Sequence, residues 1–94
     1  MTKYALITGG AKRIGAAIAS TLHSNGYTIL LHYGQSEEQA LALQSRLNRL
    51  RPESCFIKSL NLSYETVDEL RQWVLGKTEC LDALINNASL FYPT

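Results

Sequence analysis

The 94-residue sequence lacks the features of a membrane-embedded or secreted protein. No apolar run comes near the roughly 18 residues that would indicate a membrane-spanning helix. The first residues, Met1 to Tyr4, do not begin the apolar segment of a secretory signal peptide. We therefore expect a cytoplasmic protein with no membrane partner.

A large charge of one sign is also missing. Nine Lys and Arg residues against eight Asp and Glu residues give a net charge of +1. This balance provides no extended field for nucleic acid or anionic lipid, so neither is expected as a partner. The two cysteines, Cys55 and Cys80, lack metal-ligand spacing with each other or with the two histidines. We expect two reduced thiols, one in a strand and one in a loop, and no metal site.

What the sequence does contain is an alternation of short apolar segments and longer amphipathic ones. The segments at 4–8, 28–33 and 55–60, and one within 81–86, are typical of buried strands. Helices are indicated at 14–24, from 36 to about 51, and at about 65–75. Ser36 and Gln39 have the spacing of a capping box, and Asn25-Gly26 is a helix stop. The apolar face of the first helix is expected to contain Ile14, Ala17, Ile18 and Leu22.

This βαβαβαβ order predicts an α/β fold, a Rossmann-like doubly wound parallel sheet that is incomplete. Strand order 3-2-1-4 would place the topological switch point between the first and fourth strands. The loops at 9–15 and 86–94 follow those two strands, so a ligand should lie there. We expect residues 1–94 to be one cofactor-binding part of a single domain.

The loop after the first strand is rich in glycine and reads TGGAKRIG from Thr8 to Gly15. Gly9 permits a tight turn, and Gly15 lets the helix approach the sheet closely. The free N–H groups at the helix start favour a pyrophosphate, helped by the helix dipole. A Walker A loop is excluded because no Gly-Lys-Ser/Thr occurs. The simpler alternative is a turn whose glycines serve helix packing alone.

Arg13 stands in this loop where a third glycine often occurs. An arginine is a costly choice for a plain turn, but it suits bidentate recognition of phosphate. The alternative is an exposed arginine that only adds solubility.

Together these motifs resemble the short-chain dehydrogenase/reductase family. The resemblance rests on Thr8-Gly9-x-x-x-Arg13-Ile14-Gly15 and on Asn86-Asn87-Ala88. With His32-Tyr33-x-x-Ser36 and the segment from Ser89 to Thr94, the chain looks like the pteridine reductase branch and its dihydromonapterin and dihydrofolate reductase relatives. The resemblance runs the whole chain but covers only about the first third of a typical member.

The resemblance implies that a dinucleotide contacts Gly9, Lys12, Arg13, Ile14, Gly15, Tyr33, Ser36, Asn61, Leu62, Asn87, Ala88 and Ser89. It also implies that Asn86 ties the sheet together and that Phe91 stacks on a pterin substrate. Two alternatives stay open: Asn61 as a turn residue that caps a strand end, and Phe91 as a core aromatic.

The implied cofactor is NADP(H). Residues 32–36 contain no acid to hold the ribose 2′-hydroxyl of NAD, whereas Arg13 and Ser36 suit a 2′-phosphate. Gln35 departs from the branch, which commonly has Arg there, so one cationic contact is lost. Glu37 is the nearest acid and would serve NADH instead.

The family's catalytic Tyr-x-x-x-Lys pair is missing from the sequence, since no tyrosine has Lys four places later. We therefore expect the cofactor half of a reductase, silent by itself. The whole protein would be an NADPH-dependent, homo-oligomeric reductase of dihydropteridines or dihydrofolate. The alternatives are a short-chain carbonyl or ketoacyl-type reductase, whose substrate is a carbonyl compound, and a non-catalytic remnant.

Overall fold

Four parallel strands and three helices alternate along the chain, and the computed structural model describes residues 2–11 and 13–86. The elements are β1 (Lys3–Thr8), α1 (Arg13–Ser24), β2 (Tyr27–Tyr33), α2 (Glu37–Leu50), β3 (Cys55–Ser59), α3 (Val67–Leu75) and β4 (Ala83–Asn86). The strands form one sheet in the order β3-β2-β1-β4. The α/β class and the strand order predicted from the sequence are therefore confirmed.

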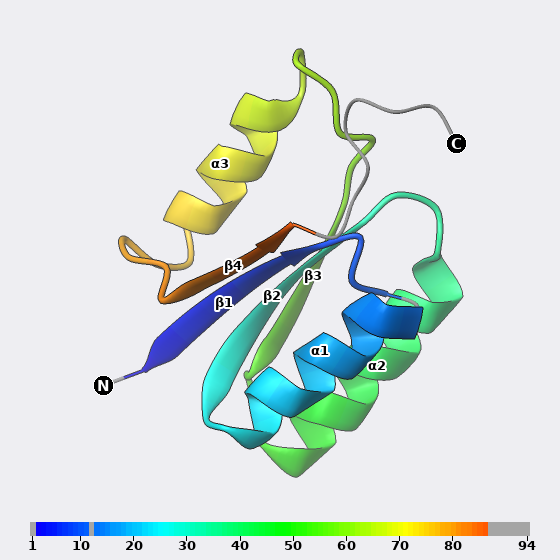
Figure 1. The fold of residues 1–94 in the computed structure, drawn as a ribbon, viewed down its shortest axis with the longest axis vertical. Coiled ribbons are helices and arrows are strands. Elements are labelled where there is room, and N and C mark those ends of the chain that lie inside the picture. The colour runs from blue at the N-terminus through cyan, green and yellow to red at the C-terminus, as the bar shows by residue number, and fades with distance from the viewer. Residues whose placement is uncertain (1, 12, 87–94) are drawn as a thin grey trace.

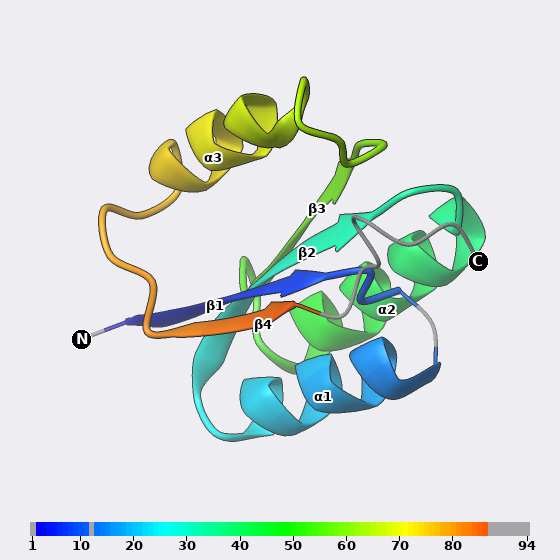
Figure 2. The same cartoon turned by 45° about the horizontal axis from the view of Figure 1, so that its top comes forward.

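Helices cover the two faces of this sheet unequally. The helices α1 and α2 pack side by side on one face, and α3 lies alone on the other (Figure 1). Figure 2 shows the three layers, with the loops that follow β1, β2 and β3 at the same end of the sheet. This end is the carboxyl edge, where parallel α/β sheets bind their ligands.

The core lies on both faces of β2, the strand between β1 and β3. Ile29, Leu30 and Leu31 are all 0% exposed. Ile29 and Leu31 belong to the cluster under α1 and α2, whereas Leu30 belongs to the cluster under α3. Successive side chains point to opposite faces of a strand, so a continuous apolar run fits a strand that is covered on both sides.

The predicted apolar face of α1 is confirmed in part: Ile18 and Leu22 pack, partly buried, against the core, whereas Ala17 is exposed. Gly15, Ala19 and His23 are buried, whereas Ile14 is 69% exposed. Small residues at four-residue spacing let the helix lie close to the sheet, and this turns the larger aliphatic side chains toward the flank beside β4. The buried imidazole of His23 is accommodated by a 2.6 Å hydrogen bond between its Nε2 and Ser54 Oγ.

The helix ends follow the sequence signals in part. Gly26 has φ 94° and its N–H donates to the carbonyl of His23, as expected for a glycine stop after α1. Ser36 does occupy the N-cap position of α2, but its side chain makes no cap hydrogen bond. With ψ at 55°, its backbone is not in the extended conformation typical of a capping serine, so the predicted capping box is wrong.

Both cysteines are free thiols, as expected. Cys55 is buried in β3 and Cys80 is exposed in the loop before β4. Burial raises the pKa of the Cys55 thiol to about 12, so this thiol is not a reactive nucleophile. Within residues 2–11 and 13–86, no helix is long and apolar enough to cross a membrane.

Candidate functional site

The two strands at the switch point are joined at their carboxyl ends. Thr8 of β1 and Asn86 of β4 are register partners. The Thr8 hydroxyl donates to Asn86 Oδ1 over 2.9 Å. Asn86 therefore ties the sheet together, as the resemblance implied, and the loops that follow both strands begin next to each other.

The turn after β1 is pressed onto the ends of β1 and β2. Gly9 has φ 63°, a left-handed conformation that glycine adopts without strain. The N–H of Gly10 donates to the main-chain oxygen of His32 over 3.0 Å. A Cβ on Gly10 would lie 2.5 Å from Leu31 Cδ1 and 2.7 Å from Ile7 Cγ2. Sequence reasoning missed the packing role of Gly10, for which the Gly9-Gly10 pair was the only signal.

Arg13 occupies the start of α1 at a cost to stability. Its φ of 52° is left-handed, which costs a non-glycine residue roughly 1–2 kcal/mol. Its cation also lies at the positive end of the helix dipole, and α1 has no acidic residue in its first turn. An exposed arginine that only adds solubility would gain nothing from this position. The geometry instead suits an anionic group placed before the helix.

The other predicted residues of this turn lie on opposite sides of α1. Gly15 is buried on the face of the helix that packs toward the sheet. Ile14 is exposed, so it is accessible to a ligand or to another part of a larger protein. Lys12 lies outside the described residues.

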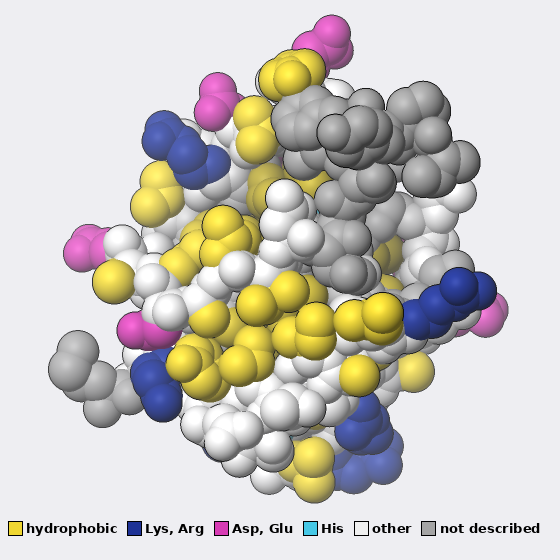
Figure 3. Space-filling view, in the orientation of Figure 1, with side chains coloured by type: hydrophobic (Ala, Val, Ile, Leu, Met, Phe, Trp, Pro, Cys, Tyr) yellow, Lys and Arg dark blue, Asp and Glu magenta, His cyan; other side chains and the backbone are white. Residues whose placement is uncertain are grey.

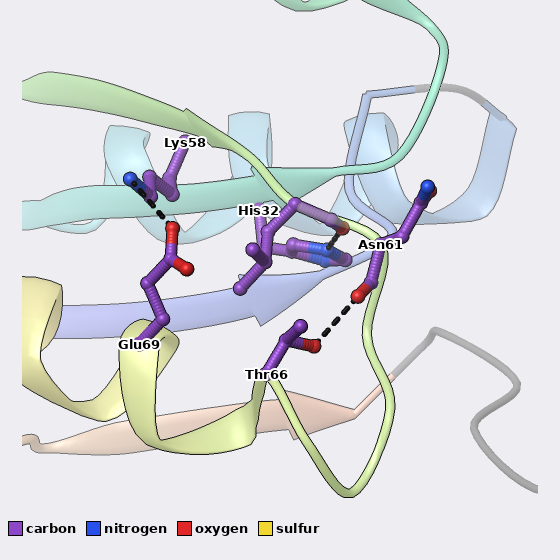
Figure 4. A network of polar contacts seen from close by, with 6 residues as sticks. His32, Lys58, Asn61, Thr66 and Glu69 are labelled. Atoms are coloured by element: carbon purple, nitrogen blue, oxygen red, sulfur yellow. Dashed lines mark hydrogen bonds and ion pairs between the residues drawn. The ribbon is translucent and has the colours of Figure 1, made fainter.

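The loops after β2 and β3 bring Ser36 and Asn61 to the same edge. Ser36 leads into α2, and its hydroxyl is not used for capping. Asn61 is exposed, and its Oδ1 lies 3.8 Å from the place of a Cβ on Gly34. The Asn61 carbonyl accepts a 2.6 Å hydrogen bond from Thr66 Oγ1 (Figure 4). The side-chain amide of Asn61 thus faces the loop that contains Gln35.

Two of the predicted residues reach the edge with their backbone only. Tyr33 is 6% exposed and packs in the cluster under α1 and α2. Leu62 is half-buried on the α3 side, where it packs against the cluster that contains Leu6 and Leu70. The last four predicted site residues lie outside the described part of the chain: Asn87, Ala88, Ser89 and Phe91.

His32 is a residue of this site that sequence reasoning missed. Its ring is 3% exposed, and Nδ1 accepts a 3.1 Å hydrogen bond from the N–H of Gly9. Its Nε2 lies 2.7 Å from the carbonyl oxygen of Leu60 and therefore carries the proton (Figure 4). Burial lowers the pKa of His32, and the bond to Leu60 opposes this in part. A polar side chain within an apolar strand was the available signal.

Apolar surface surrounds β4, the edge strand. A hollow of about 290 Å³ between α3 and the strands β1 and β4 is lined mostly by leucine and valine side chains. On the other face, Ile85 lies beside the flank of α1 that carries Ile14 and Ile18. Figure 3 shows hydrophobic side chains in a band across this side of the molecule. Leu84, in β4 itself, is 61% exposed.

Comparison with known proteins places this arrangement in a family. The family described as short chain dehydrogenase matches residues 3–94. A pteridine reductase 1 from Leishmania tarentolae is 38% identical over an alignment of 108 residues, which covers 96% of this chain and 37% of that relative.

Other relatives are similar over the same part of the chain. A 3-oxoacyl-[acyl-carrier-protein] reductase FabG from Staphylococcus aureus is 32% identical over 90 residues, covering 96% of this chain and 37% of the relative. An uncharacterized oxidoreductase YmfI from Bacillus subtilis is 33% identical over 89 residues, covering 94% and 36%. The chain thus spans a little over a third of the length of these relatives. With the parallel sheet of order β3-β2-β1-β4 and the glycine turn at its carboxyl edge, the chain belongs to the short-chain dehydrogenase/reductase family.

Proposed function

We propose that the chain is the NADPH-binding portion of a short-chain reductase. The observation that carries the proposal is Arg13, held in a left-handed conformation at the start of α1, where it lowers stability. A guanidinium at a helix N-terminus, directly after a glycine turn, suits phosphate recognition. A residue that lowers stability in this way is best explained by a ligand that it binds.

Different residues at the carboxyl edge would contact different parts of the dinucleotide. Gly9, Ile14 and Gly15 would bring the backbone to the pyrophosphate, with Lys12 beside them. Arg13 and the Ser36 hydroxyl would meet the 2′-phosphate, since the Ser36 side chain makes no cap bond. Tyr33, Asn61 and Leu62 would border the adenine end. Asn87, Ala88 and Ser89 would approach the nicotinamide-side ribose, and when bound the nicotinamide supplies the hydride.

Two acidic residues follow the loop after β2, at the beginning of α2. Glu37 and Glu38 occupy its first turn, where they complement the helix dipole. Both are exposed. They therefore already have a stabilising role in α2, which favours the phosphate reading of Arg13 and Ser36 over a role for Glu37 with NADH.

The binding experiment compares NADPH and NADH on the chain at pH 8 by calorimetry. We expect NADPH to bind at least tenfold more tightly, and Arg13→Gln to remove most of that preference. Arg49→Gln is the matched control because Arg49 is an exposed arginine in the last turn of α2. Equal affinities for the two dinucleotides, or equal effects of the two substitutions, would refute NADPH selectivity through Arg13.

For the whole protein we propose reduction of a dihydropteridine or dihydrofolate, with Phe91 stacked on the pterin. The 38% identity to a pteridine reductase supports this class. The second candidate is a carbonyl or ketoacyl-type reductase, favoured by the 32% identity to a 3-oxoacyl-[acyl-carrier-protein] reductase. A small-molecule substrate, a homo-oligomer and a cytoplasmic location go with both candidates.

The native product decides between them. Its intact mass, measured after purification from its own cells, should exceed 10.5 kDa. Turnover with NADPH is then compared for dihydrobiopterin, dihydrofolate and an acetoacetyl thioester. Faster reduction of the thioester would favour the second candidate. The 94-residue chain alone should bind NADPH without reducing any of them, because it contains no Tyr-x-x-x-Lys pair.

A further inference from the structure

His32 connects three segments at the carboxyl edge of the sheet. Its ring accepts from the N–H of Gly9 after β1 and donates to the carbonyl of Leu60 after β3. Its main-chain oxygen accepts from the N–H of Gly10 over 3.0 Å. One residue of β2 thus holds two consecutive amides of the glycine turn and the chain that leaves β3. Figure 4 shows the bond from the ring to the chain that leaves β3.

We propose that His32 is a positioning residue for the dinucleotide-binding turn, and that its protonation releases Gly9 and weakens nucleotide binding. The inference rests on the proposed binding of NADPH at this turn. His32 acts through the turn and is not itself assigned a contact with the cofactor.

The two ring hydrogen bonds require a neutral imidazole. Nδ1 must present a lone pair to the Gly9 N–H, while Nε2 keeps its proton for Leu60. With a second proton on Nδ1, this N–H and the N–H of Gly9 would be two donors facing each other. His32 is only 3% exposed. A buried donor without an acceptor is unfavourable, so the turn or the ring must move.

Within the part of the chain that the structure describes, the charged groups around His32 leave no counterion for an imidazolium. Lys58 is its register partner on β3, and the Nζ of Lys58 lies 3.5 Å from Glu69 Oε2 on α3. Asp68 and Arg71 of α3 face each other at 3.9 Å. On the β1 side Thr8, Gly9 and Gly10 carry no charge, and Arg13 further along the turn is a cation. With Glu69 already paired, burial dominates and lowers the pKa of His32 below its ordinary 6.5.

The sign of the pH effect follows from this. The turn is held at pH 8, where the imidazole is neutral, and it is released as the pH falls through the lowered pKa of His32. Since binding and the uptake of one proton exclude each other, affinity should fall up to tenfold per pH unit below that pKa.

Two substitutions separate the two hydrogen-bonding functions of the His32 ring. In His32→Asn the amide oxygen takes the place of Nδ1, so the acceptor for Gly9 is kept and nothing titrates. In His32→Gln the longer amide takes the place of Nε2, so the donor to Leu60 is kept and the acceptor for Gly9 is lost. Circular dichroism and urea unfolding at pH 8 establish that each variant is folded.

The binding arm measures the affinity for NADP⁺ at pH 8 and at one pH unit below the midpoint that the ring protons of His32 show by NMR. The 2′-phosphate also titrates near pH 6, but this contribution is common to wild type and His32→Asn. We expect wild type to weaken several-fold more than His32→Asn over this range. At pH 8, His32→Asn should bind within about threefold of wild type, and His32→Gln about tenfold more weakly. An equal pH dependence of wild type and His32→Asn would overturn the proposal.

The second arm needs no nucleotide. The amide resonance of Gly9, followed by NMR, should shift with the same midpoint as the ring protons of His32, and should not shift in His32→Asn. His23, the other buried histidine, is bonded to Ser54, and its own ring protons report its titration. If the Gly9 amide resonance does not shift as His32 titrates, the coupling is refuted. Failure of wild type to bind NADP⁺ at pH 8 would instead refute the proposed function, while this arm still tests the coupling.

Discussion

Replacement of Arg13 by glycine should stabilise the chain and at the same time weaken its binding of NADPH. The left-handed backbone at φ 52° costs arginine about 1–2 kcal/mol. Glycine adopts it freely, but its greater freedom in the unfolded chain takes back about 0.5–1 kcal/mol. Removal of a cation from the start of α1 adds about 0.3–1 kcal/mol. The unfolding free energy should therefore rise by about 1 kcal/mol, which raises the Tm of a domain this small by roughly 4–8 °C.

Arg13→Gln separates backbone strain from charge. Glutamine keeps the Cβ and therefore the left-handed strain, but it removes the cation. Its unfolding free energy should rise by only about 0.3–1 kcal/mol. Both variants lose the charge-assisted hydrogen bonds to phosphate, worth about 1.5–3 kcal/mol, so both should bind NADPH at least tenfold more weakly.

The assay combines urea unfolding followed by circular dichroism with calorimetric titration of NADPH. We expect stability to decrease in the order Arg13→Gly, Arg13→Gln, wild type. Wild type should bind NADPH more tightly than either variant. A glycine variant less stable than wild type would refute the strain at position 13. Equal stability of the two variants would assign the whole gain to charge.

Three further predictions concern the turn, the histidines and the loop after β2. Gly10→Ala should lower the unfolding free energy by about 1–3 kcal/mol in urea unfolding, because the added Cβ would overlap Leu31. Gly34→Ala should be nearly neutral, because the nearest described atom, Asn61 Oδ1, would lie 3.8 Å from the added Cβ. Stability should be constant above about pH 6.5 and fall below it, since burial lowers the pKa of His23 and of His32 and the unfolded chain then binds more protons. Each histidine contributes at most about 1.4 kcal/mol per pH unit, and a flat profile from pH 7.5 to 5.5 in urea unfolding would contradict this. Gln35→Arg should increase the preference for NADPH over NADH about tenfold in calorimetric titrations, and an unchanged ratio would remove the 2′-phosphate from this loop.

Much of the fold follows from local pattern. Apolar runs such as Ile29 to Leu31 predict strands covered on both faces, and the alternation with helices leaves few topologies once crossovers are right-handed. Gly26 ends α1 as predicted because only a residue free of Cβ strain suits φ 94°. Arg13 is likewise unusual by sequence alone, because it stands where a third glycine often occurs.

Contacts between distant segments did not follow from pattern. The hydrogen bonds of His32 to Gly9 and Leu60 join residues 23 and 28 positions away, and no local signal specifies such partners. Ile18 and Leu22 of α1 pack against the core as predicted, but its most deeply buried residues were not predicted. Periodicity ranks residues by hydrophobicity, whereas close packing on the sheet selected the small Gly15 and Ala19.

The sequence by itself determined the element types, the strand order and the position of the glycine turn, because these depend on periodicity, glycine placement and the handedness of crossovers. Only the tertiary structure decided which side chains hold that turn. The lack of room for a Cβ at Gly10 and the acceptor of the Gly9 amide exist only once β1 and β2 lie side by side. The physical reason is that strand pairing brings together groups whose separation along the chain carries no information about their separation in space.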